Sequence, residues 1–212
     1  MGVTDHAPGM PGTCDPINFL GLYVVPREFY GVSIYFGVEN NVLSDGSMTL
    51  PEDVLQSLDY GIVGIHGTCY ENQGIKKNTD NLIKCMEHPK VFFVSHPDDV
   101  AFPLDYERLV PAAKENGVAL EINNATIREG YKQNCIENIR TYLSLCMRYK
   151  TNIYVGSDAH DPSFIGEFSC AERLLEEMGF DEGLIINNSE EKYRKFIHFE
   201  VGKKQGQLPL WL

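Results

Sequence analysis

Acidic and histidine side chains follow several short hydrophobic segments of this 212-residue chain. Five of them come just after segments of strand-like composition: Glu39, His66, His96, Asp158 and His160. One such histidine alone is more often a hydrogen-bonding residue than a ligand. Several histidines and acids at the same position after their strands indicate a metal site, because imidazole nitrogens and carboxylate oxygens bind Zn²⁺, Mn²⁺ and Fe²⁺ well. A carboxylate can bridge two such ions and lower the pKa of a water held between them, which suits hydrolysis.

These residues are far apart in the chain, so the fold must bring them together. From residue 33 onward, short β-rich segments alternate with helical patterns, which is typical of βα units and a parallel sheet. Strands are predicted at residues 33–38, 60–65, 91–95, 118–122, 153–156 and 184–186. Helices are predicted at residues 51–56, 79–87, 105–116, 134–149, 169–178 and 190–196. Active sites of such sheets lie at the carboxyl ends of the strands, so the five side chains should converge there.

The organisation outside these units is simple. Short connections between the predicted elements favour one compact domain over residues 1–212. The first 30 residues carry Pro8, Pro11, Pro16 and Pro26, and we predict that they form a long ordered loop.

Composition limits the location and the partners. The chain shows neither a basic start followed by an apolar run nor a stretch approaching ~20 apolar residues, so we expect a soluble, cytoplasmic protein without membrane contact. The six cysteines are scattered, which favours reduced thiols. A formal net charge of −12 repels phosphate backbones and makes nucleic acid an unfavourable partner. A small anionic substrate remains compatible, because bound cations dominate the potential of a site.

Some of the candidate ligands are also compatible with a purely structural role. Glu39 and Asp158 could cap helices that follow them, although Asn40 and Asn41 continue without a helical pattern. His6 follows too short a segment for the pattern to decide its role.

Two further pairs of polar residues surround the predicted site. Glu121 and Asn123 alternate along a strand, so both point to one side and could orient metal ligands; ordinary hydrogen bonding at a strand end explains them equally well. Arg128 and Lys132 lie in the next loop and are candidates for binding the phosphate of the substrate. Arg128 could do so through two parallel hydrogen bonds, in the bidentate geometry of a guanidinium. Most exposed basic residues only aid solubility.

The chain resembles the polymerase and histidinol phosphatase (PHP) superfamily, and most closely its small stand-alone bacterial phosphatases. The resemblance spans nearly the whole chain and depends on an ordered set of motifs: Thr4-Asp5-His6-Ala7-Pro8, Gly37-Val38-Glu39-Asn40-Asn41, Gly64-Ile65-His66, Ser95-His96-Pro97, Glu121-Ile122-Asn123-Asn124 and Gly156-Ser157-Asp158-Ala159-His160. Any one tripeptide is weak evidence, whereas the ordered set is highly specific.

The resemblance implies a distorted (β/α)7 barrel and up to three divalent ions, commonly Zn, Mn or Fe, that hydrolyse phosphoesters. By position, Glu39 is the carboxylate that bridges two ions, His66 and His96 complete the shell of one, and Asp158 serves the other. The third ion would be held by the two remaining histidines: His6 and His160. The implied chemistry is attack of a metal-activated water on phosphorus, with Glu39, Asp158 and His160 as the catalytic residues.

One departure from the family pattern changes the expectation for the fold. Family members begin with a strand that bears His-x-His, followed by another histidine and a first helix, whereas this chain starts a few residues before Thr4-Asp5-His6. We therefore expect a barrel without its first strand and helix, and incomplete shells for the ions assigned to Asp158 and His160. An open strand edge would require a covering partner, would lower the stability, or would belong to a chain that starts upstream.

The leading hypothesis is a metal-dependent phosphatase or phosphoesterase that acts on a small phosphorylated substrate. A second hypothesis is histidinol phosphatase or exonuclease activity, since relatives do both, although the acidity of the chain argues against polymeric nucleic acid. A third hypothesis is a catalytically inactive metal-binding or scaffold remnant. A homo-oligomer is compatible with the resemblance, because relatives are often trimers.

Overall fold

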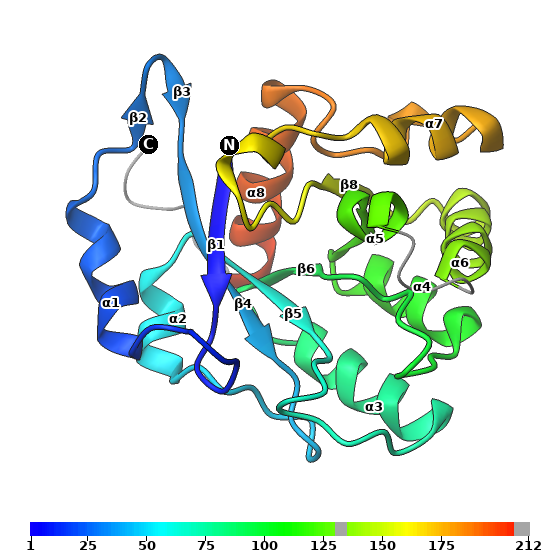
Figure 1. The fold of residues 1–212 in the computed structure, drawn as a ribbon, viewed down its shortest axis with the longest axis horizontal. Helices are drawn as coiled ribbons and strands as arrows, with labels where there is room; N and C mark the ends of the chain where they lie inside the picture. Colours follow the sequence, from blue (N-terminus) through cyan, green and yellow to red (C-terminus); the bar gives the residue numbers. More distant parts are fainter. Residues whose placement is uncertain (130–134, 206–212) are drawn as a thin grey trace.

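A curled parallel sheet forms the centre of the computed structural model, which describes residues 1–129 and 135–205, with side chains described as far as residue 197 (Figure 1). The described sheet has six strands in the order β1-β4-β5-β6-β7-β8. Their bounds are Gly2–His6, Tyr35–Asn41, Tyr60–Gly64, Val91–Val94, Ala119–Asn123 and Ile153–Gly156. All five pairings are parallel, so the carboxyl ends of the strands meet at one edge of the half-barrel. The predicted α/β class is confirmed, and the expected distorted, incomplete barrel is a curled half-barrel of six described parallel strands.

Helices pack against the sheet and cover its flanks (Figure 1). The α-helices α1 to α8 span Pro16–Leu20, Glu52–Ser57, Ile75–Met86, Tyr106–Glu115, Asn124–Glu129, Cys135–Tyr149, Ser169–Met178 and Glu190–Gln205. Short 3₁₀ turns η1 to η3 span Gly21–Val24, Pro162–Phe164 and Glu182–Leu184, and a small antiparallel pair joins β2 (Glu28–Phe29) to β3 (Val32–Ser33). None of the described helices is long and apolar enough to cross a bilayer.

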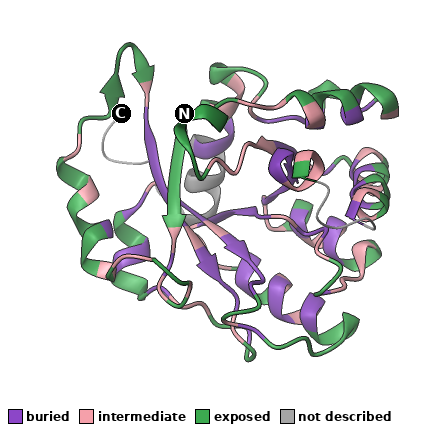
Figure 2. Ribbon diagram, in the orientation of Figure 1, coloured by how far each residue is buried: buried purple, intermediate pink, exposed green. Residues whose placement is uncertain are grey.

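The main core lies between the sheet and α3, α4, α6 and α7. Branched and aliphatic residues of β5 to β8, such as Val63 and Leu120, pack there against fully buried Leu82, Leu109 and Ile139 of the helices. Because both faces of the inner strands are covered, these strands are almost continuously buried (Figure 2).

The opposite face of the sheet changes from aromatic to polar along the strands. Near the amino ends it carries an aromatic cluster of Tyr35, Tyr60, Phe93 and Tyr154, which packs against Phe196 and Ile197 of α8. Side chains alternate along a strand, so Glu39 and Asn41 share this face with Tyr35 in β4, and Glu121 and Asn123 share it in β7. The aromatic cluster thus closes one end of the half-barrel, and the polar residues gather at the other end.

The first segment of the chain was predicted as a loop and is instead a strand. Residues Gly2–His6 pair with β4 in register, with His6 opposite Glu39. Four of these five residues are exposed, and β1 is an edge strand (Figure 2). An exposed polar edge strand lacks the alternating hydrophobic pattern that identifies buried strands, which explains the wrong prediction.

The strand predicted at residues 184–186 was also wrong. Asp181 caps a 3₁₀ turn at Glu182–Leu184 by accepting a hydrogen bond from the Gly183 amide, and only Ile185 forms a single bridge to Ile153 of β8. The backbone amides of Leu184 and Ile185 donate their hydrogen bonds within this turn, so they are not available for pairing with a neighbouring strand. Two predicted helices differ in extent by four residues or more: α3 starts four residues earlier than predicted, and α8 continues to Gln205. The predicted start of α6 at Asn134 lies outside the described residues.

Candidate metal centre

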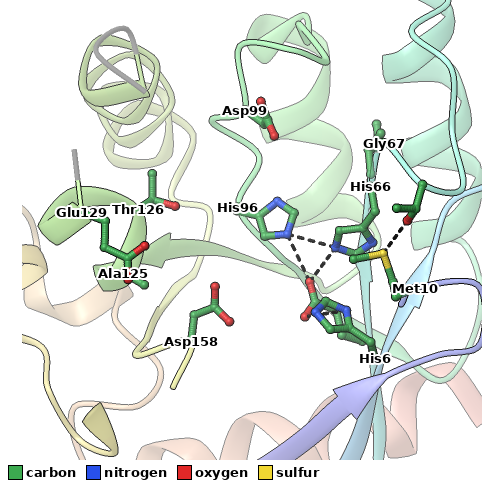
Figure 3. Close-up of a pocket in the computed structure, with 13 residues that line it drawn as sticks. His6, Met10, His66, Gly67, His96, Asp99, Ala125, Thr126, Glu129 and Asp158 are labelled. Carbon is green, nitrogen blue, oxygen red and sulfur yellow. Dashed lines mark hydrogen bonds and ion pairs between the residues drawn. The ribbon is translucent and has the colours of Figure 1, made fainter. Parts of the chain in front are cut away.

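A cavity of about 420 Å³ opens at the carboxyl ends of the strands. Five of the predicted ligands line it: His6, Glu39, His66, His96 and Asp158 (Figure 3). They reach the cavity from β1, from β4, from the loops after β5 and β6, and from the loop after β8. The parallel arrangement of the strands therefore gathers side chains that are up to about 150 residues apart in the chain.

Two imidazoles and one carboxylate form the centre of this cluster. The Nε2 atom of His66 lies 3.1 Å from Oε1 of Glu39, and Nε2 of His96 lies 3.2 Å from the same oxygen. The two Nε2 atoms are 3.1 Å apart. Three candidate ligand atoms, one from β4 and two from the loops after β5 and β6, thus converge on one point (Figure 3).

His6 approaches the same carboxylate from the other side. Its Nδ1 atom lies 3.5 Å from Oε2 of Glu39, is buried, and makes no hydrogen bond within the described residues. One ligand atom from each of His6, Glu39 and His66 fits within a group whose members lie within 4.8 Å of one another. Both oxygens of Glu39 therefore face imidazole nitrogens, which is the arrangement that a bridging carboxylate needs.

The electrostatics of the cluster require positive charge. Burial opposes ionisation of Glu39, but hydrogen bonds to His66 and His96 hold its pKa well below the usual range. Burial also disfavours the charged form of His96, yet the hydrogen bond to Glu39 and the charges of Glu39 and Glu121 raise the pKa of His96 to about 10. Burial lowers the pKa of His66. Without a cation, the raised pKa of His96 thus keeps a proton on an imidazole that contacts the ionised carboxylate of Glu39.

These observations fit a divalent cation. Two imidazole nitrogens at 3.1 Å cannot both present lone pairs to each other without a proton or a cation between them. The donor set of imidazole and carboxylate suits Zn²⁺, Mn²⁺ or Fe²⁺, and His6 adds a buried nitrogen that lacks a hydrogen bond within the described part of the chain. His6, Glu39, His66 and His96 are the residues that would hold the ion.

Glu121 and Asn123 form hydrogen bonds with two of the candidate ligands, His96 and Asp158. The carboxylate of Glu121 accepts a hydrogen bond of 2.7 Å from the backbone amide of His96. Asn123 donates to Oδ2 of Asp158 at 3.1 Å and to Glu121 at 3.3 Å. Burial raises the pKa of Glu121 to about 8. Hydrogen bonds of Glu121 and Asn123 thus link the backbone of His96 to the side chain of Asp158.

The backbone is strained at two of the candidate ligands. His96 has φ of 27° and Asp158 has φ of 46°, both in the left-handed region that side chains other than glycine rarely adopt. Such strain persists only where surrounding contacts enforce it, and it concentrates at functional sites. The Glu121 hydrogen bond is one such contact at His96.

Two glycines make room for the cluster, and the sequence-based prediction did not assign them a role. A Cβ on Gly64 would clash with Ser95 Oγ and would lie 2.9 Å from the imidazole of His66. A Cβ on Gly156 would clash with the carboxylate of Glu121. Asn41, which lies 2.7 Å from Nδ1 of His66, was also not assigned. Its position two residues after Glu39 on β4 is the signal that could have identified it.

His160 stands apart from the cluster. Its side chain is 73% exposed, its Nδ1 lies 3.4 Å from Oδ1 of Asp158, and its ring centroid lies 6.1 Å from that of His6. His160 is next to Asp158, but it is neither among the residues that line the cavity nor among the grouped ligand atoms.

Arg128, one of the two predicted phosphate-binding residues, lies outside the cluster of candidate ligands. The guanidinium of Arg128 stacks over the ring of Phe164 at 3.9 Å and pairs with Glu129 at 2.7 Å. Glu129 lines the cavity, whereas Arg128 is not among the lining residues. Lys132 lies outside the described residues.

Curated proteins from bacteria are similar to this chain over most of its length. A probable phosphatase of Caldicellulosiruptor saccharolyticus is 38% identical over 92% of this chain and 81% of its own length. A probable phosphatase of Clostridium botulinum is 36% identical over 98% of this chain and 83% of its own length. No family model matches the chain.

Solved structures share the fold at low identity. A histidinol phosphate phosphatase from Lactococcus lactis, in complex with zinc, L-histidinol and phosphate, matches with a TM-score of 0.53 at 18% identity, over 85% of this chain and 82% of that one. A chain of an archaeal ribonuclease P with mature tRNA matches with a TM-score of 0.52 at 15% identity, over 94% and 81%. Together with the cluster at the strand ends, the sequence matches identify the family: the chain belongs to the bacterial proteins that carry the name probable phosphatase.

Proposed function

We propose that this chain is a metal-dependent phosphatase of the PHP type that hydrolyses a small phosphorylated substrate. The observation that carries the proposal is the convergence of His66 Nε2 and His96 Nε2 on one oxygen of Glu39. The names of the relatives support phosphatase activity, and the zinc and phosphate in the Lactococcus lactis structure support a divalent ion and a phosphorylated substrate.

The protein contributes binding and orientation to this chemistry. Glu39, His66, His96 and His6 would hold the ion, for which we propose Zn²⁺, Mn²⁺ or Fe²⁺. A divalent cation bound there supplies positive charge that stabilises the charge developing on phosphoryl oxygens. The ionised Glu39 keeps the neighbouring imidazoles oriented, and Glu121 fixes the backbone of His96.

Asp158 and His160 would act at the mouth of the cavity. We propose that Asp158 is a ligand on the side of the cavity away from His66, oriented by Asn123. The exposed imidazole of His160, 3.4 Å from Asp158, can pass a proton to the leaving oxygen of the substrate. By the resemblance, these residues with His6 would hold further ions, up to three in all.

The size and surroundings of the cavity favour a small substrate. A volume of about 420 Å³ accommodates a small phosphorylated molecule, and a net charge of −12 disfavours a polynucleotide. Arg128 is the proposed phosphate partner, since its neighbour Glu129 lines the cavity and Phe164 holds its guanidinium flat. Cytoplasmic location and a homo-oligomeric state remain predictions.

Hydrolysis of p-nitrophenyl phosphate tests the proposal. We expect phosphate release that stops after treatment with EDTA and returns on addition of Zn²⁺ or Mn²⁺. Glu39→Gln should abolish the activity, whereas Glu52→Gln, which alters a surface pair with His88, should retain it. Activity that is indifferent to chelators, or that survives in Glu39→Gln, would refute the proposal. A folded chain that binds zinc and hydrolyses none of a panel of phosphate esters would favour the scaffold hypothesis.

A further inference from the structure

Asn41 connects the metal cluster to the polypeptide around it. The side chain is fully buried on β4, two residues after Glu39, and its Oδ1 lies 2.7 Å from Nδ1 of His66. Ring nitrogen Nδ1 is the one that faces away from the cluster, because Nε2 of His66 faces Glu39 and His96. Asn41 therefore contacts the ligand from behind.

The hydrogen-bond partners of Asn41 determine which way its amide points. Nδ2 lies 3.1 Å from the carbonyl oxygen of Pro8, 3.3 Å from that of Ala7 and 2.9 Å from Oγ1 of Thr49. Carbonyl oxygens only accept hydrogen bonds, so the amide nitrogen must face them. Oδ1 of Asn41 is then the atom that faces His66.

The orientation of the amide determines the tautomer of His66. Since an amide oxygen only accepts, the proton of a neutral His66 must be on Nδ1. Nε2 is then left with its lone pair, directed at the point where Glu39 and His96 converge. This is the form of the imidazole that can bind a cation at Nε2.

We propose that Asn41 is a positioning residue that holds His66 as the Nδ1–H tautomer and, through the carbonyls of Ala7 and Pro8, fixes the segment that follows His6. One side chain thereby keeps two ligands from different strands in register. The part of this inference that concerns a cation rests on the proposed function, whereas the tautomer of His66 does not depend on it.

Two measurements on Asn41 variants test the inference. Long-range ¹H–¹⁵N spectra of metal-free, ¹⁵N-histidine-labelled protein at about pH 8, where neutral imidazole predominates, report the tautomer of His66 directly. Competition with a chromogenic chelator reports the affinity for Zn²⁺. The variants are Asn41→Leu, which removes both the acceptor for His66 and the donor to Ala7 and Pro8, and Asn41→Asp, which keeps the acceptor and removes the donor. Asn78→Leu is the matched control, because Asn78 is equally buried and bonds to Gln73, Asn72 and Pro103, none of which is a candidate ligand.

We expect Nδ1–H for His66 in the wild type, in Asn41→Asp and in Asn78→Leu, and a loss of this preference in Asn41→Leu. Zinc affinity should fall by about 10- to 100-fold in Asn41→Leu and by less in Asn41→Asp, which loses only the donor to Ala7 and Pro8. It should stay within a few-fold of the wild type in Asn78→Leu. An Nε2–H signal for His66 in the wild type would overturn the inference even if Asn41→Leu does not fold. Unchanged zinc affinity in a folded Asn41→Leu would also overturn it. If the wild type binds no zinc but Asn41→Leu still shifts the tautomer, the proposed function fails and the role of Asn41 in orienting His66 stands.

Discussion

The Nε2 atoms of His66 and His96 lie 3.1 Å apart, although the two residues follow different strands and are 30 positions apart in the chain. Two imidazole nitrogens bound to one tetrahedral zinc ion at its usual bond length are about 3.3 Å apart. The histidines thus already have nearly the separation that a shared ion requires. The loops after β5 and β6 therefore hold the two imidazoles at a separation that the proposed ion could use with little rearrangement.

Replacement of Gly64 by alanine should disturb the metal site. The added Cβ would clash with Ser95 Oγ and press on the imidazole of His66. We expect the free energy of unfolding to fall by about 1–3 kcal/mol and zinc affinity to fall by about 10-fold or more. Urea denaturation and chelator competition measure the two effects. Gly67→Ala is the control, because its Cβ would meet only Phe102 at an ordinary 3.5 Å; equal behaviour of the two variants would show that Gly64 has no special role.

The stability of the metal-free chain should depend on the protonation of Glu121. Burial raises the pKa of Glu121 from 4.5 to about 8, so the folded state binds this proton more tightly than the unfolded state does. Its contribution to stability is complete below pH 4.5 and is lost as the pH rises through 8. We expect the free energy of unfolding to decrease between about pH 5 and 8, by at most about 1.4 kcal/mol per pH unit from this group.

Comparison with Glu121→Gln isolates that contribution. The pKa of His96, raised from 6.5 to about 10, acts in the same direction above pH 6.5, so the wild type alone does not separate the two groups. Urea unfolding in EDTA across this range should give a shallower decline for the variant. Parallel curves for the two proteins would show that Glu121 does not titrate differently on folding.

Substitution of Arg128 should weaken substrate binding more than it slows the chemical step. The guanidinium is held in place by Phe164 and by its pair with Glu129, so it would lose little conformational freedom on contact with a phosphate. For Arg128→Ala we expect KM for a phosphate ester to rise by about 10-fold, which corresponds to about 1.4 kcal/mol, with a smaller change in kcat. Arg140→Ala, which breaks a surface pair with Glu177, should change neither constant. An unchanged KM would remove Arg128 from the substrate site.

The central part of the site was predictable because of one general property of parallel sheets. Glu39, His66 and His96 each stand at the carboxyl end of a strand, and those ends share one edge whatever the length of the connections. The sequence therefore predicts their convergence without any knowledge of the helices. The exact pairing of atoms on Glu39 could not be predicted, since it depends on the curl of the sheet.

The contacts of Asn41 illustrate what sequence reasoning misses. Its partners come from the loop after β1, from Thr49 and from His66, and no local pattern links these three segments. The edge strand β1 was missed for a related reason, because its only evidence is its pairing with β4. Stacking of Arg128 on Phe164 likewise depends on the course of the loop after β8. Interactions fixed by tertiary packing leave no periodic signal.

Metal content per chain tests the central claim most directly. Protein purified without chelators would be analysed for zinc, manganese and iron in the wild type, in His66→Ala and in His88→Ala, whose imidazole pairs with Glu52 outside the cavity. The account predicts near-stoichiometric metal in the wild type and in His88→Ala, and a marked loss in His66→Ala. A wild type without bound metal, or a folded His66→Ala with undiminished metal, would contradict it.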